Sequence, residues 1–119
     1  MARFIVALVF FSLFYTSTAM AECRQFIELW SASKVAQELG RSEEWVVSSY
    51  KVNVWAKKTE DGKFPKVGEM RAGSRAILLE ISDQDFKVKS PFDGSIGWIG
   101  QDQVSSILRQ DDQTFEPCN

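Results

Sequence analysis

Hydrophobic and polar residues change their spacing along the chain, and each change predicts a different kind of structure. The run from Phe4 to Tyr15 is almost entirely apolar. Between Glu22 and Gly40, apolar residues recur at intervals of three and four, the spacing of one helical face. From Trp45 onward, β-branched and aromatic residues alternate with polar ones in short segments separated by turn residues, which is typical of strands.

The apolar run at the start has the form of a secretory signal peptide. Arg3 precedes it, and Ala19-Met20-Ala21 follows it as a small-x-small cleavage site. The run is shorter than the ~20 apolar residues that a membrane-spanning helix needs. We therefore expect residues 1–21 to be removed, which leaves a mature chain without a stable membrane span.

Two cysteines, Cys23 and Cys118, lie near the two ends of the expected mature chain. In an exported protein, the simplest arrangement is one structural disulfide between them. The sequence has no CxxC motif and no histidine that could activate a thiol. We expect this bond to tie a C-terminal tail, residues 110–119, back to the start of a periplasmic or secreted protein.

One helix is expected within an N-terminal segment of residues 22–44, with Gly40 as its C-terminal cap. Its apolar face would pack on the following domain or, alternatively, bind a partner. Short strands separated by turns are expected within residues 45–109, and they predict a mainly β domain with a small five-stranded barrel. The strand-like segments are Trp45–Val47, Tyr50–Trp55, Lys66–Met70, Arg75–Ile81, Phe86–Lys89, Ile96–Ile99 and Ser105–Leu108.

Alternation within these segments predicts which residues fill the barrel. One face of each strand would point inward, and glycines would allow the sharp bends that a small barrel needs. The glycines expected at such bends are Gly68, Gly73, Gly94 and Gly97. The expected core residues are Val52, Val54, Ile77, Leu79, Val88 and Trp98.

Three motifs follow one another in a characteristic order. The first is Val52-Asn53-Val54-Trp55, the second is Val67 to Gly73, and the third is Asp93-Gly94-Ser95-Ile96-Gly97-Trp98-Ile99. This order resembles the bacterial SH3-like (SH3b) domain of cell-envelope proteins, over roughly residues 45–108. The resemblance implies an SH3-like barrel that binds cell-wall peptides or protein segments. Trp55 stands where that family usually has an arginine, and the N-terminal helix lies outside its pattern.

Composition excludes several classes of function. The chain of 119 residues has no histidine, so Ser-His-Asp and Cys-His catalysis and histidine-containing metal sites are impossible. A formal net charge of −2 argues against a nucleic-acid-binding surface. The aspartates do not follow a calcium-loop spacing. We expect no enzyme, no cofactor and no metal.

A candidate ligand site is expected around Trp55, which alternation turns outward if its valine neighbours point inward. A shallow groove lined by Trp55, Phe64 and Phe86 would run between the loop at residues 57–65 and the turn around Asp83. Lys57 and Lys63 would steer an acidic partner, and Phe64 would add apolar area. The alternatives are that the loop is a solvated hairpin arm and that Trp55 is covered by the N-terminal helix.

The sequence therefore favours an exported, non-enzymatic binding module of the bacterial cell envelope. Its expected partner is an envelope protein or a cell-wall peptide, held in an SH3-like groove. Two alternatives stay open. One is a structural accessory subunit of an envelope assembly, and the other is a small secreted inhibitor that plugs the cleft of another enzyme.

Overall fold

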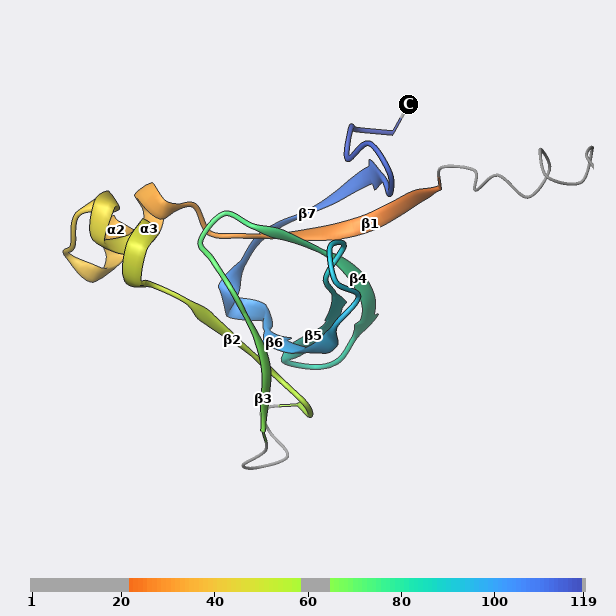
Figure 1. Ribbon diagram of the computed structural model, residues 1–119, viewed down its shortest axis with the longest axis horizontal. Helices are drawn as coiled ribbons and strands as arrows, with labels where there is room; N and C mark the ends of the chain where they lie inside the picture. The colour runs from red at the N-terminus through yellow and green to blue at the C-terminus, as the bar shows by residue number, and fades with distance from the viewer. Residues whose placement is uncertain (1–21, 59–64, 119) are drawn as a thin grey trace, which may run out of the picture.

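The computed structural model describes residues 22–58 and 65–118, which form a strongly curled sheet with a helical hairpin at one side (Figure 1). The elements in chain order are β1 (Cys23–Leu29), α2 (Ala32–Leu39), α3 (Glu43–Ser49), β2 (Val52–Trp55), β3 (Lys66–Met70), β4 (Arg75–Ile81), β5 (Asp85–Lys89), β6 (Ile96–Gly100), the 3-10 turn η2 (Gln101–Gln103) and β7 (Val104–Asp111).

The strands of the described residues form one antiparallel sheet in the order β3-β2-β6-β5-β4-β1-β7. The mainly β class is thereby confirmed. The number of strands differs from the prediction, because the sheet has seven strands instead of five. The sheet is also open: β3 and β7 stand at its two ends, and each has one strand as a neighbour.

The first strand was not predicted, and the expectation of helix from Glu22 onward is wrong for this part of the chain. Residues Cys23–Leu29 form β1, which lies between β4 and β7. Phe26 and Ile27 are both fully buried although they point to opposite faces. Ile27 belongs to the core, and the ring of Phe115 covers Phe26 from the outside. Burial on both faces removed the alternation that would have indicated a strand.

The predicted helical periodicity holds from Ala32 onward. The Ser31 hydroxyl accepts a hydrogen bond from the Lys34 N–H and caps the start of α2. Gly40 ends the helix in the left-handed conformation, with φ of 64°, as its position predicts. The structure therefore confirms the helix end and moves its start.

A second helix, α3, occupies the segment Trp45–Val47, where a strand was expected. Ser42 caps it by accepting a hydrogen bond from the Trp45 N–H, and Glu43 and Glu44 lie in its first turn. This cap and these charges stabilise a helix N-terminus and outweigh the β-propensity of Trp and Val. Neither α2 nor α3, nor any other helix of the described ranges, is long and apolar enough to span a bilayer.

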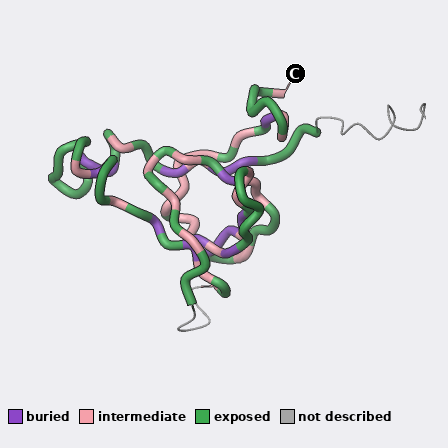
Figure 2. The backbone as a smooth tube through the Cα atoms, in the orientation of Figure 1, coloured by how far each residue is buried: buried purple, intermediate pink, exposed green. Residues whose placement is uncertain are grey.

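The main core lies inside the curl of the sheet, and a smaller one lies in the helical hairpin (Figure 2). Val52, Val54 and Val88 are buried in the main core, as the alternation predicts. Val35, Ala36 and Val46 form the smaller cluster between α2 and α3. The core residues of the sheet are Ile27, Leu29, Val52, Val54, Ala76, Phe86, Val88 and Ile99.

Strand β4 presents the opposite face to the one predicted. Ala76 is buried and Leu78 packs against the core, whereas Ile77 is half-buried and Leu79 is 43% exposed. The pairing explains this, because Ala76 lies opposite Ile27 of β1 and Leu78 lies opposite Val88 of β5. The prediction that Ile77 and Leu79 fill the core is therefore wrong. The apolar residues of β4 fit either face, so their alternation did not determine which face was inside.

The predicted disulfide joins Cys23 at the start of β1 to Cys118 in the C-terminal tail. Its two Cα atoms are 6.0 Å apart, and the bond spans 95 residues of sequence. The tail is also paired to the end of β7, where Gln110 bridges to Pro117. Disulfides persist in oxidising compartments, so this bond supports an exported location.

Candidate functional site

The residues predicted to bind a ligand do not form one groove. Trp55 ends β2 and lies directly opposite Trp98 of β6, and both side chains are half-buried. Lys57 follows in the exposed segment after the strand. Lys63 and Phe64 lie outside the described residues. The structure thus places Trp55 beside Trp98, which was expected in the core of the barrel.

Phe86 belongs to the core and is only 7% exposed, so it cannot line a surface groove. It lies opposite Ile99 of β6, and the fully buried Ile99 points to the same interior. Its neighbour Lys87 takes the outer face, because side chains alternate along a strand. Without Phe86, the predicted groove lacks its second wall.

Trp98 lies on the outer face of the sheet and does not fill the barrel. Its neighbours Gly97 and Ile99 are the residues of β6 that point inward. The Nζ atoms of Lys58 and Lys87 lie 5.8 Å and 6.0 Å from the centroid of the indole ring. Trp98 is thus half-buried on this face and makes cation–π contacts with both lysines. The core position expected for this tryptophan is taken by Ile99.

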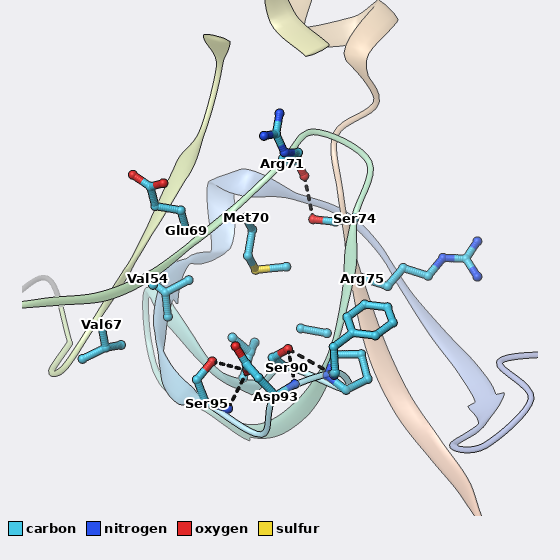
Figure 3. A pocket seen from close by; sticks show the side chains of 15 residues that line it. Val54, Val67, Glu69, Met70, Arg71, Ser74, Arg75, Ser90, Asp93 and Ser95 are labelled. Carbon is cyan, nitrogen blue, oxygen red and sulfur yellow. Dashed lines mark hydrogen bonds between the residues drawn. The ribbon is translucent and has the colours of Figure 1, made fainter. Parts of the chain in front are cut away.

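A distinct hollow lies between β3 and β4, which are consecutive in sequence but do not pair. The two strands diverge from the turn between Arg71 and Ser74, and the turn at residues 90–95 lies on the opposite side of the hollow (Figure 3). We call this hollow the β3–β4 seam. Its volume is about 270 Å³, and its floor includes the core residues Val54, Ala76 and Val88.

Met70 supplies the flexible part of the seam. Its thioether side chain points from β3 into the hollow (Figure 3) and packs partly against the core. A thioether adapts its shape to apolar partners more easily than a branched side chain does. Val67, also on β3, is 42% exposed at the edge of the hollow. The seam therefore combines a fixed apolar floor with an adaptable wall.

The charged groups at the rim of the seam are already bonded. Arg71 donates a hydrogen bond of 2.7 Å to the Val47 carbonyl oxygen, which ties β3 to α3. Arg75 donates from Nε to Glu28 at 2.8 Å. On β3, Glu69 accepts a 2.7 Å bond from Lys66, which lowers its pKa. These pairs fix the rim and reduce its net attraction for a charged ligand.

Asp93 holds the turn that borders the seam. Its Oδ1 accepts hydrogen bonds from the Ser95 N–H at 2.9 Å and from the Ser95 hydroxyl at 2.8 Å. The backbone bond to Ser95, followed by the serine hydroxyls, lowers the pKa of Asp93, so it stays ionised near neutral pH. The carboxylate stabilises the turn.

The seam was not predicted, although Val67 to Gly73, which forms one of its walls, was interpreted as a family motif. The turn at residues 90–95 forms another wall. A useful signal was Phe92, a large apolar residue in the middle of that turn. Phe92 is 86% exposed, and a ring in such a position is informative where it borders an apolar hollow.

The described residues contain no free thiol and no group of metal ligands. Both cysteines are consumed in the disulfide. Within residues 22–58 and 65–118, no three residues among His, Cys, Asp and Glu are grouped as a metal site would require. What the seam offers is an apolar hollow, a strand edge and a rigid polar rim, which together are suited to binding.

The fold class agrees with the SH3-like resemblance only at the level of a mainly β, curled sheet. The open seam and the additional strand β1 distinguish it from the five-stranded barrel that the resemblance implies. Comparison of the chain with protein-family models, curated proteins and solved structures found no match.

Proposed function

We propose that this protein is an exported, non-enzymatic binding module of the bacterial cell envelope that holds an extended segment of a protein or cell-wall peptide in the β3–β4 seam. One observation carries the proposal. At this end of the sheet, the edge of β3 lies beside an apolar hollow that reaches the core.

An extended peptide is the ligand that this geometry suits best. The outer edge of a terminal strand presents N–H and C=O groups that can pair with an added strand. Alternate side chains of that strand would point into the hollow beside Met70. A hollow of about 270 Å³ lies below the usual range of ~300–1,000 Å³ for small-molecule pockets, which favours one or two peptide side chains.

The bonded rim favours recognition by shape and main-chain pairing over recognition by charge. Arg75 and Glu69 each keep an internal partner at less than 3 Å. A ligand that recruited either group would have to replace that bond, so its net gain would be small. The ligand segment is therefore mainly apolar and uncharged where it enters the seam.

Export is supported by the disulfide and by the position of the expected cleavage site. Cleavage after Ala21 would retain all of β1, and the first residue would be Glu22. The Glu22 nitrogen lies 3.1 Å from Oδ1 of Asp112, so a free α-ammonium there would form an ion pair. Mass spectrometry of the protein isolated from its native host should find Glu22 as the N-terminal residue, and an intact N-terminus at Met1 would contradict export by this route.

The test of the binding proposal begins with peptides selected from a random library on the purified protein. The affinity of a selected peptide is then measured for the wild type and for Val67→Asp, which places a charge at the mouth of the seam. We expect at least tenfold weaker binding, a loss of about 1.4 kcal/mol, because a carboxylate would be desolvated by the ligand.

Ile81→Asp is the matched control. Ile81 is also a β-branched residue on a strand, it is 61% exposed, and it does not line the seam. Its substitution should leave the affinity unchanged, and near-ultraviolet circular dichroism should show both variants folded. Equal effects of the two substitutions, or selection of peptides that perturb the Trp55–Trp98 face, would refute the assignment to the seam. Sedimentation with purified cell wall separates a wall peptide from a protein ligand.

A second candidate function is a structural subunit of an envelope assembly. The helical hairpin projects beside the sheet (Figure 1), and Leu39 and Val47 on it are 50% and 58% exposed. Such side chains are suited to docking against another apolar surface. Leu39→Glu would then abolish co-purification with the assembly and leave peptide binding at the seam intact.

A further inference from the structure

A second hollow lies next to the seam, on the outer face of β1, and we call it the aromatic pocket. Its rings are Phe26 of β1, Phe92 of the turn between β5 and β6, and Phe115 of the C-terminal tail. Phe26 and Phe115 meet edge to face with centroids 6.0 Å apart. Phe92 and Phe115 are 6.2 Å apart. Three distant parts of the sequence thus contribute one ring each.

Phe92 and Phe115 each have a feature that is unusual for a residue that only stabilises a fold. Phe92 is 86% exposed, so it buries little of its apolar area. Phe115 has a φ of 62°, a conformation that costs free energy for a residue with a side chain. The hollow beside these two residues has a volume of about 390 Å³, which leaves room for another aromatic ring next to them.

One polar side chain that lines this pocket has a buried atom without a hydrogen-bond partner among the described residues. Gln110 of β7 lines the hollow and is only 3% exposed. Its side-chain oxygen, Oε1, is buried and accepts no hydrogen bond from the described residues. A buried acceptor without a donor is unfavourable, and nearly all such groups in folded proteins have partners. Oε1 is fully buried, so the side chains that line the pocket must shift for an incoming donor to reach and satisfy it.

The aromatic pocket and the seam lie on two sides of one shared wall. Both are lined by Ser74, Arg75, Pro91 and Phe92. A chain that lies extended in the seam could therefore place one of its side chains in the aromatic pocket by crossing this shared ridge. Arg75 is the charged residue on this ridge, and it forms an ion pair with Glu28 at 2.8 Å. Because the two charges compensate each other, binding does not require a charged ligand.

We propose that the aromatic pocket receives an aromatic side chain with a hydrogen-bond donor, that of a tyrosine or tryptophan, from the same peptide that occupies the seam. The ring packs against Phe92 and Phe115, and the O–H or N–H donates to Oε1 of Gln110. Tyrosine and tryptophan combine an apolar ring with one donor, which matches an apolar site with one buried acceptor. This inference rests on the proposed peptide-binding function and specifies the side chain that the module recognises.

The experiment uses two small probes and the full mature protein. N-acetyl-tyrosinamide and N-acetyl-phenylalaninamide differ by one hydroxyl, and their affinities are measured by NMR titration of backbone amides. We expect the tyrosine probe to bind about two- to tenfold more tightly, the gain of one hydrogen bond. The amides that shift should be those of residues 90–95, Gln110 and Phe115.

Two variants assign the preference to Gln110. Gln110→Met keeps the size of the side chain and removes the acceptor, so the tyrosine-to-phenylalanine preference should fall to about one. The thermal midpoint of this variant should stay the same or rise, because no unsatisfied oxygen is buried. Phe92→Ala changes an exposed residue, so the fold should be retained while both probes bind less.

A further variant distinguishes failure of the aromatic-pocket proposal from failure of the seam proposal. Val67 lines the seam and not the aromatic pocket, so Val67→Asp should not change the affinity of either probe. The proposal is overturned if the two probes bind equally, if neither shifts the pocket amides, or if the preference survives in Gln110→Met. Loss of peptide binding in Val67→Asp with an intact tyrosine preference would support both sites. An intact tyrosine preference without any selected peptide would refute the seam and leave the aromatic pocket assigned.

Discussion

The two terminal strands of the sheet, β7 and β3, differ in what lies beside their outer edges. At the β7 end, the C-terminal tail returns along the strand: Pro117 bridges to Gln110, the Cys118 N–H donates to the Arg109 carbonyl at 3.2 Å, and the disulfide fixes the tail to β1. At the β3 end, the last strand has β2 on one side and the hollow of the seam on the other.

The comparison indicates where a partner strand can bind. An uncovered strand edge can pair with other chains, and folded proteins usually block such edges. In this chain, the tail pairs with residues 109–111 at the end of β7 and is held there by the disulfide, whereas the outer edge of β3 lies beside an apolar hollow. Covering one edge while leaving the other open is what we expect if the open edge is retained for a ligand.

The largest expected effect is that of removing the tie at the covered end. In Cys23→Ser with Cys118→Ser, a loop of 95 residues is no longer closed in the unfolded chain. We expect the free energy of unfolding to fall by about 3–5 kcal/mol in urea titrations. In this variant, amide hydrogen exchange should accelerate at residue 118 and its neighbours in the tail, with little change in β3. A loss below about 1 kcal/mol would show that the tail is held without the disulfide.

A smaller effect is expected where the open end is anchored. β2 and β3 pack closely on Gly97 of β6, because a Cβ atom there would come within 2.5 Å of Val54 Cγ1 and 2.7 Å of Val67 Cγ2. Gly97→Ala should therefore destabilise the fold by about 1–3 kcal/mol through overpacking. Gly68→Ala is the control, since its nearest contact would be Val54 Cβ at 3.9 Å. Equal losses in the two variants would mean that close packing does not anchor β3.

The smallest expected effect depends on pH and lies at the covered end. Asp112 accepts a 2.8 Å hydrogen bond from Arg24, and this bond, followed by that from the Glu22 N–H, lowers the pKa of Asp112. The ionised form is thus favoured in the folded state. The resulting stability is present above the ordinary pKa of 3.8 and is lost as the pH falls through the lower folded-state value.

Asp112→Asn removes this contribution. The wild type should be more stable than the variant at pH 7, and the two should converge below pH 3.8 in denaturant titrations at several pH values. Asp83→Asn, an exposed carboxylate in the turn after β4, is the control. A difference between wild type and Asp112→Asn that is constant with pH would assign the effect to packing.

Local patterns were sufficient to predict much of the fold. Val52 and Val54 alternate with polar neighbours, and they are buried. The position of Gly40 predicted a helix end, and the two cysteines predicted the disulfide. Each of these features depends on a few adjacent residues or on a simple pairing rule, so the sequence carries them directly.

The features that were missed depend on contacts between distant segments. The sequence of β1 fits either a helix or a strand, because its adjacent residues Phe26 and Ile27 are both apolar. Its contacts with β4, β7 and the tail determine that it is a strand. Trp98 and Phe86 were assigned to the wrong sides of the sheet, since an apolar residue in a strand does not itself show which face is inside. The seam arises from β3 and β4 failing to pair, which local sequence does not indicate.

The most direct test of the account is amide hydrogen exchange with and without a selected peptide. If the peptide pairs with the open edge, exchange should slow at alternate amides between Lys66 and Met70, because an added strand bonds every second N–H. Exchange in β7 should not change. Slowed exchange along β7 or around Trp55 and Trp98, with β3 unaffected, would contradict the account.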